Sequence, residues 1–204
     1  MRTLLRTCGE LSVTAGVAML LFCAYLLWGT GSYTEWYQHV LKQQLQQTAK
    51  VAKLGKIHLG DAVAMIRIPR LGRDYEYAVL EGVGQEDLRR GPGHYPGTAR
   101  PGKVGNFVLS GHRTTYAAPF NRIDELRRGD AIVIDAPEAR YTYRVSGKQV
   151  VTPDQVDVIA PVPGRPGARP TEAVITLTTC HPEYSARERL VVYGVLSAKR
   201  DRRT

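Results

Sequence analysis

The pattern of residue types changes at Gly60, and this change constrains the fold more than any other feature. After Gly60 come short runs rich in aliphatic and β-branched residues, separated by glycine and proline. Runs of about four to eight residues bounded by turn formers are typical of strands. Several short strands with few helices predict a mainly β protein, an eight-stranded closed β-barrel with short helices. We expect strands over residues 62–68, 75–80, 105–110, 131–134, 141–151, 173–178 and 189–196.

Helices and long loops are expected at few places in this domain. Residues 85–90 predict a single helical turn, and residues 118–128 predict a short helix closed by Gly129. The stretch 91–102 is rich in glycine and proline, and these turn formers predict a loop. The stretch 153–170 carries five prolines. Loops of that length in compact domains are usually functional, so we expect it to shape a binding groove.

An apolar stretch from Leu11 to Trp28 precedes the domain. As a helix it is about 27 Å long, close to the hydrocarbon thickness of a bilayer. Two arginines precede it, and the next basic residue is Lys42, so the positive-inside rule places the N-terminus in the cytoplasm. We predict an uncleaved transmembrane signal-anchor over residues 11–31. A cleaved signal peptide is the alternative, but no clear small-x-small cleavage site follows.

The chain is therefore expected to have five parts. A weak apolar stripe after the anchor predicts a helical spacer that lifts the barrel off the bilayer. The last residues are rich in lysine and arginine and are expected to be disordered. The parts are a cytoplasmic N-terminus (1–10), the signal-anchor (11–31), a juxtamembrane spacer (32–59), the β-barrel domain (60–197) and a basic tail (198–204).

The chain carries a formal net charge of +9. Such a charge favours attraction to an anionic surface, such as phospholipid head groups or wall polymers. The sequence has no zinc-finger or helix-turn-helix pattern, which argues against a nucleic-acid partner.

Two strand-like runs far apart in the chain end in a reactive residue. Residues 106–110 lead to His112, residues 175–179 lead to Cys180, and Arg189 opens the next strand. A thiol, an imidazole and a guanidinium are the parts of a nucleophilic acyl-transfer site. Cys180 is the only cysteine after the N-terminal region, so an intradomain disulfide or a multi-cysteine metal site is excluded. A packed structural thiol is the alternative.

These segments closely resemble the active-site segments of the sortases, the cysteine transpeptidases of Gram-positive bacterial surfaces. Leu109-Ser-Gly-His-Arg113 matches the histidine motif, and Thr176-Leu-Thr-Thr-Cys180 matches the Thr-Leu-x-Thr-Cys signature. Arg189 follows the cysteine by nine residues. The similarity runs in order over residues 63–196 and implies the sortase β-barrel. It also implies that Cys180 is the nucleophile, His112 the acid/base and Arg189 the oxyanion stabiliser and substrate clamp.

Residues 112–120 and 180–189 resemble the class E sortases of high-GC actinobacteria. Those enzymes act in housekeeping anchoring and prefer Leu-Ala-x-Thr-Gly over Leu-Pro-x-Thr-Gly signals. Tyr116 stands where that class carries a tyrosine linked to this preference, so the resemblance implies that it binds substrate. Class D, which also has a His-Tyr-Pro-Gly-Thr loop, is the close alternative. A pilin-polymerising enzyme is a further one, but no lid motif precedes the barrel over residues 53–61.

Neighbouring residues compete for some of these roles. Arg187 and Arg189 are two residues apart, so a strand would place both side chains on one face. Only the family spacing favours Arg189 as the oxyanion stabiliser. Thr179 either orients substrate or is an ordinary strand residue. His181 adjoins the thiol, but successive strand residues point to opposite faces, so it ranks below His112. Arg113 is expected to face away from His112.

The resemblance implies a membrane-anchored sortase that cleaves a C-terminal LAxTG/LPxTG-like signal between threonine and glycine. The acyl group would pass through a thioester on Cys180 to an amine of a peptidoglycan precursor or cross-bridge. The expected enzyme is a monomer without metal or cofactor, anchored in the cell membrane by a single pass, with its catalytic domain outside. A hydrolytic cysteine protease of the same fold and a catalytically silent binding barrel are the alternatives.

Overall fold

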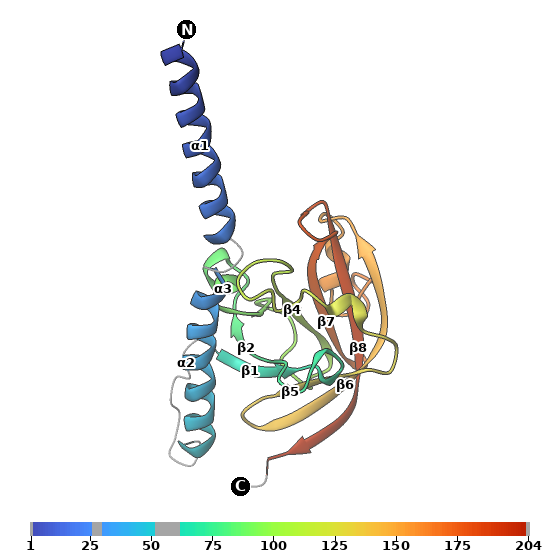
Figure 1. The fold of residues 1–204 in the computed structure, drawn as a ribbon. Helices are drawn as coiled ribbons and strands as arrows, with labels where there is room; N and C mark the ends of the chain where they lie inside the picture. Colours follow the sequence, from blue (N-terminus) through green and yellow to red (C-terminus); the bar gives the residue numbers. More distant parts are fainter. Residues whose placement is uncertain (1, 26–29, 52–61, 203–204) are drawn as a thin grey trace.

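The computed structural model describes residues 2–25, 30–51 and 62–202 (Figure 1). Its α-helices are α1 (Arg2–Ala24), α2 (Thr30–Val51) and α3 (Gln85–Arg90). Its strands are β1 (Ala62–Arg67), β2 (Glu76–Glu81), β3 (Gly93–His94), β4 (Gly105–Ser110), β5 (Ala131–Asp135), β6 (Ala139–Val151), β7 (Ala173–His181) and β8 (Glu188–Asp201). Short 3-10 helices are η2 (Pro69–Leu71), η3 (Ile123–Glu125) and η4 (Val156–Ile159).

The strands form a closed barrel in the order β1-β2-β3-β4-β7-β8-β6-β5. The predicted eight-stranded closed barrel is therefore confirmed, and the shortest strand, β3, lies within the stretch predicted as a loop. Pairs β2–β3 and β4–β7 are parallel, and the other pairs are antiparallel. Closure removes free sheet edges and encloses one main core. Its largest fully buried side chains include Phe107, Tyr143, Phe120, Ile66 and Leu109.

Helix α2 packs along the barrel rather than standing apart from it as a detached spacer (Figure 1). Leu41 of α2 is buried in a second apolar cluster with side chains from β1 and β2. Gln38, 5% exposed, exchanges hydrogen bonds with the backbone of Ala78 in β2. The helix predicted after the anchor is thus present, and in this structure it forms part of the barrel's packing.

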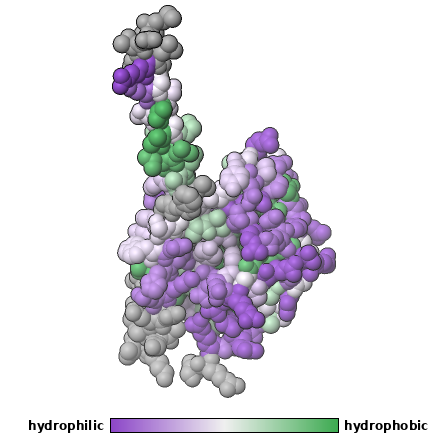
Figure 2. All heavy atoms as spheres, viewed as in Figure 1, coloured by the Kyte–Doolittle hydropathy of each residue, from purple (hydrophilic) through white to green (hydrophobic). Residues whose placement is uncertain are grey.

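Helix α1 extends away from the barrel (Figure 1). It carries exposed apolar side chains, including Met19, Leu20 and Phe22, beside a mostly hydrophilic barrel surface (Figure 2). No helix within the described ranges has both the length and the apolar character required of a membrane span. The predicted span 11–31 runs through residues 26–29, which lie outside the described residues.

Two predictions of local structure are wrong. Residues 118–128 form turns and the short 3-10 helix η3, and Ala118, with a φ of 42°, lies outside helical geometry. The apolar residues of this segment, Phe120, Ile123 and Leu126, are strictly three apart, and that spacing suits a 3-10 turn as well as an α-helix. The tail is not disordered up to residue 201, because β8 continues to Asp201 and pairs with Ala139 of β6.

Candidate active site

Three adjacent strands bring the predicted catalytic residues to one end of the barrel. Ser110 of β4 pairs with Thr178 of parallel β7, and Gly111 N extends this contact by donating to Thr178 O at 3.2 Å, so His112 follows β4 at the end of the barrel where Cys180 lies. On the other side of β7, Cys180 pairs directly with Arg189 of β8. Directly paired residues of neighbouring strands project to the same face. The thiol and the guanidinium therefore originate side by side, and the imidazole follows the end of the neighbouring strand β4.

The pairing of β7 with β8 distinguishes the two candidate arginines, Arg187 and Arg189. Glu188 pairs with His181 and opens β8, so Arg187 lies before the strand and is exposed. Arg189 is half-buried, and its Nη1 donates to the carbonyls of Ala186 and Glu188 at 2.8 and 2.9 Å. Arg189 is thus the arginine placed opposite the thiol.

Thr179 joins the two reactive strands. It is 2% exposed, and its hydroxyl donates to the carbonyl of Gly111 at 2.8 Å. Gly111 N also donates to Thr178 O at 3.2 Å. A side chain at position 111 would lie 2.7 Å from the Phe120 ring, so only glycine fits there. In this structure Thr179 aligns the strand ends, and its predicted role in substrate binding stays a prediction.

The segment after His112 has a strained backbone held by the barrel. Tyr116, Ala117 and Ala118 have φ values of 52°, 58° and 42°. Three successive non-glycine residues in this region are costly and need support from their surroundings. Tyr77 Oη donates to Ala117 O at 3.2 Å, and Tyr75 Oη donates to Pro119 O at 2.6 Å. The strands therefore fix Tyr116 beside the histidine.

The environment of His112 suits a proton-transferring group. Its ring centroid lies 5.0 Å from that of Tyr116. Its Nε2 is buried and has no hydrogen-bond partner among the described residues. Burial first, and then the positive charge of Arg89, lower the pKa of His112 below its ordinary value of 6.5. The imidazole is therefore neutral at pH 7, with a ring nitrogen uncommitted to any protein group.

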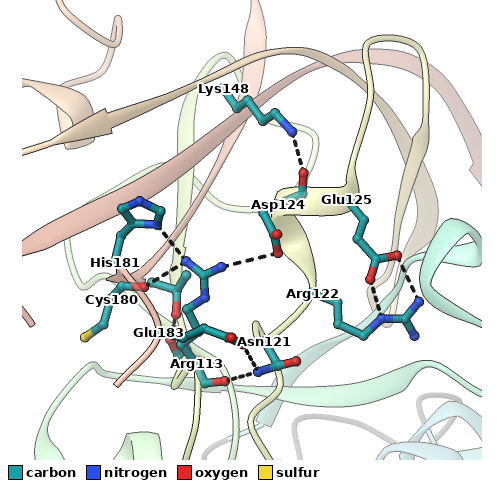
Figure 3. Close-up of polar contacts among 11 residues, drawn as sticks. Arg113, Asn121, Arg122, Asp124, Glu125, Lys148, Cys180, His181 and Glu183 are labelled. Atoms are coloured by element: carbon teal, nitrogen blue, oxygen red, sulfur yellow. Dashed lines mark hydrogen bonds and ion pairs between the residues drawn. The ribbon is translucent and has the colours of Figure 1, made fainter. Parts of the chain in front are cut away.

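A network centred on Arg113 lies on the face of β7 that carries His181, opposite to the Cys180 side chain (Figure 3). Arg113 is 6% exposed, and its Nη1 donates to the carbonyl of Cys180 at 3.3 Å and to Nδ1 of His181 at 2.8 Å. Because arginine only donates, Nδ1 of His181 is the acceptor. Arg113 Nη2 lies 3.4 Å from Asp124 Oδ1. Figure 3 shows the Cys180 sulfur and the His181 ring pointing in opposite directions, as strand alternation requires.

The same network ties together the segments that follow the histidine and the cysteine. Asn121 Nδ2 donates to Arg113 O and to Glu183 Oε1, both at 2.8 Å. These bonds connect the loop after His112 to the loop after Cys180, which are 62 residues apart in the chain. The two reactive strand ends are therefore bound to each other through side chains as well as through the β-ladder.

The long proline-rich loop is anchored to β4. Asn106, 1% exposed, donates from Nδ2 to the carbonyls of Val158 and Ala160 and accepts from Thr176 Oγ1 at 2.7 Å. The part of the chain that the structure describes contains no group of three or more histidine, cysteine, aspartate or glutamate side chains arranged to hold a metal ion. The chemical capability of the site lies in its thiol, imidazole and guanidinium.

Comparison with known proteins agrees with this geometry. The Sortase domain family matches residues 66–197. The chain belongs to the sortase family. Sortase SrtE1 of Streptomyces coelicolor is 36% identical in an alignment of 207 positions that covers 97% of this chain and 58% of that protein. The class E prediction is supported by this similarity.

Solved sortase structures match the barrel as well. Sortase E1 from Streptomyces coelicolor, with a tripeptide in its active site, has a TM-score of 0.64 at 37% identity and covers 70% of this chain and 91% of its own. SrtF from Corynebacterium diphtheriae has a TM-score of 0.68 at 31% identity, with coverages of 72% and 90%. Sortases are cysteine transpeptidases, and this chain spans 58% of the length of SrtE1.

Two arginines of this sortase were not identified as site residues from its sequence. Arg113 was expected only to face away from His112, whereas it contacts the Cys180 strand. Arg89 lies in a helical turn with no reactive neighbours in the sequence, yet its charge acts on His112. A long-range contact of this kind leaves no local pattern, so neither residue had a signal apart from its charge.

Proposed function

We propose that this chain is a membrane-anchored class E sortase. It cleaves a C-terminal Leu-Ala-x-Thr-Gly or Leu-Pro-x-Thr-Gly signal and joins the threonine to a peptidoglycan amine. The observation that carries the proposal is the order of β4, β7 and β8, in which Cys180 pairs with Arg189 and β4 ends two residues before His112. The chain spans 58% of the length of SrtE1, so the activity is argued from these residues.

The first half-reaction breaks the threonine–glycine bond. Neutral His112 accepts the proton of the Cys180 thiol, and the resulting thiolate attacks the threonine carbonyl carbon to form a C–S bond. The developing oxyanion is stabilised by the Arg189 guanidinium, which is charged at any working pH. Protonated His112 then gives its proton to the departing glycine nitrogen as the C–N bond breaks. The product is a thioester between Cys180 and the threonine acyl group.

The second half-reaction transfers that acyl group. Neutral His112 accepts a proton from the incoming amine, whose nitrogen attacks the thioester carbonyl carbon. The C–S bond breaks, and the proton on His112 returns to the departing sulfur, which restores the Cys180 thiol and the neutral imidazole. A thioester conserves the energy of the cleaved peptide bond, so a new amide forms without a further energy source.

Substrate preference is assigned to the segment beside the histidine. Tyr116 is held 5.0 Å from the His112 ring, so a peptide that reaches Cys180 passes close to it. Tyr116 therefore contacts the residue that precedes the variable position of the signal. Thr179 supports this surface from beneath through its bond to Gly111.

The membrane anchor is the segment 11–31, with the N-terminus in the cytoplasm and the barrel outside. Exposed apolar side chains from Val17 to Phe22 support this proposal, since an aqueous surface would not favour them (Figure 2). Tyr33 and Trp36, 41% and 62% exposed at the start of α2, suit the outer membrane interface.

The test is mass spectrometry of products made by the full chain in detergent micelles. Leu-Ala-x-Thr-Gly and Leu-Pro-x-Thr-Gly peptides are each incubated with triglycine, beside Cys180→Ala as the control. We expect a Thr-Gly-Gly-Gly product that the variant does not make, and more of it from the alanine peptide. A threonine acid alone points to a protease, and a preference for the proline peptide points to class D. Cleavage of neither peptide overturns the proposal.

A further inference from the structure

Arg89 lies beside the active site although it belongs to a different part of the barrel. Its Cζ is 5.7 Å from the centroid of the Tyr116 ring, within the range of a cation–π contact. Tyr116 in turn lies against His112. The Nε of Arg89 is buried and has no partner among the residues that the structure describes, and its Nη1 pairs with Glu86 at 2.7 Å. A guanidinium, a phenol ring and an imidazole therefore lie in a row, with the two rings tilted by 41°.

The helix that carries Arg89 is too short to hold itself in place. Helix α3 has six residues, and helices of that length are unstable without tertiary contacts. Two side chains of α2 supply such contacts. Thr34 Oγ1 donates to the carbonyl of Arg89 at 2.7 Å, and Gln38 Nε2 donates to the carbonyl of Arg90 at 2.7 Å.

The contacts of α2 are buried and specific. Thr34 is 0% exposed and Gln38 is 5% exposed. Gln38 also bonds to both backbone groups of Ala78, so the same amide side chain fixes α3 and β2 together. The close approach needs a glycine, because a Cβ at Gly91 would lie 2.2 Å from Gln38 Nε2. Helix α2 therefore determines where Arg89 lies.

We propose that Arg89 is a positioning residue for His112, held against Tyr116 by helix α2. This inference rests on the proposed function, in which His112 is the acid/base. Arg89 fixes the Tyr116 ring that packs on the imidazole, and its charge opposes protonation of that imidazole. The element next to the membrane anchor thereby sets the state of the acid/base.

Other groups around His112 are accounted for in the test. Arg89 faces it from α3 and Tyr116 from the histidine's own loop, while Cys180 of β7 and Arg189 of β8 form the neighbouring strand pair. The measurement is made in a Cys180→Ala background, which removes the thiol as a second ionisable group. This background separates the effect of Arg89 from that of the thiol.

The experiment is an NMR titration of the histidine side chains in the full Cys180→Ala chain in detergent micelles. His112→Gln identifies the His112 signal. Arg89→Met is compared with Arg90→Met, which removes the same charge from the same helix but lies over Tyr37. We expect the His112 titration midpoint to move to higher pH in Arg89→Met and to stay in place in Arg89→Lys and Arg90→Met. Arg89→Gln gives the same comparison if Arg89→Met does not fold.

The role of α2 is tested in the same way. Thr34→Val removes the bond to Arg89, and we expect a smaller shift of the His112 midpoint in the same direction, which Thr34→Ser restores. With Cys180 intact, we expect Arg89→Met to lower kcat about tenfold through misplacement of the histidine, and Arg89→Lys to restore most of it.

Equal midpoints in Arg89→Met, Arg90→Met and the parent chain would overturn the inference. The titration does not depend on turnover, so its result is distinct from a failure of the proposed function. If the parent enzyme processes neither peptide, the proposed function fails while the titration still decides whether Arg89 acts on His112.

Discussion

Arg113 and Arg189 flank the same cysteine strand, and they are held in opposite ways. Arg113 is buried and contacts β7, His181 and Asp124 at once. Arg189 is half-buried, and among the described residues its hydrogen bonds go to carbonyls of its own turn, within three residues. One guanidinium joins distant segments, and the other is bound locally.

The difference indicates that the two arginines have different roles. A residue that aligns the nucleophile must not move during the reaction, and burial with several partners provides this rigidity. A residue that meets a developing oxyanion must reach the substrate, and local carbonyl bonds are easily exchanged for an oxyanion. The comparison therefore predicts that Arg113 affects stability and alignment, whereas Arg189 affects the reaction itself.

Replacement of Arg189 gives the largest expected effect on turnover. We expect Arg189→Met to lower kcat/KM by about 10²- to 10³-fold, because the oxyanion loses its donor. The melting temperature should stay close to that of the parent, since only local carbonyl bonds are lost. Arg187→Met is the matched control and should keep near-parent kcat/KM. Steady-state kinetics and thermal melts of the three proteins check this, and a large loss in Arg187→Met would reverse the assignment.

Replacement of Arg113 should show the opposite pattern. Arg113→Met leaves the Cys180 carbonyl and His181 without their donor, so we expect a loss of about 2 kcal/mol in unfolding free energy. We also expect kcat to fall about tenfold, with KM of the peptide little changed, because alignment is lost. Arg122→Met is the control, since it removes the exposed ion pair with Glu125 and one bond to Leu71 O at 3.1 Å, and we expect it to lose less stability (Figure 3). An unchanged melting temperature in Arg113→Met would break the comparison.

The smallest effect concerns the pH dependence of stability. Burial and Arg89 lower the pKa of His112 in the folded state below 6.5, so the unfolded chain binds its proton more readily. Above about pH 6.5, His112 is neutral in both states and does not change the free energy of unfolding. As pH falls from there to the folded-state pKa, the unfolded chain binds the proton first, so the free energy of unfolding declines. We expect His112→Gln to lose less stability than the parent between pH 7 and pH 5, as measured by thermal melts. Equal losses would mean that the histidine is not held neutral by the fold.

Strand patterning predicted most of the barrel. The runs at 105–110 and 131–134 agree with β4 and β5 within one residue, because alternating or continuous apolar runs between turn formers have few other solutions. The family signature predicted that the reactive residues lie at the ends of particular strands, and the pairing of β4 with β7 and of β7 with β8 makes these strands neighbours.

The packing of α2 could not be predicted in the same way. The apolar stripe drew attention to Leu41 and Leu45, but the face that docks also includes Thr34 and Gln38, which are polar. Hydropathy periodicity does not reveal a buried face that is held by hydrogen bonds to another element. Arg113 was missed for a related reason, since its partners lie 67 and 68 residues away.

The most direct test of the account is the intact mass of the full chain after mixing with a signal peptide in the absence of an amine. The account predicts an added mass equal to the peptide up to threonine, located on the fragment containing Cys180 and released by hydroxylamine. Cys180→Ala should show no adduct and no cleavage. Cleavage by Cys180→Ala, or an adduct on another residue, would contradict the assignment of Cys180 as the nucleophile aligned by β4, β7 and β8.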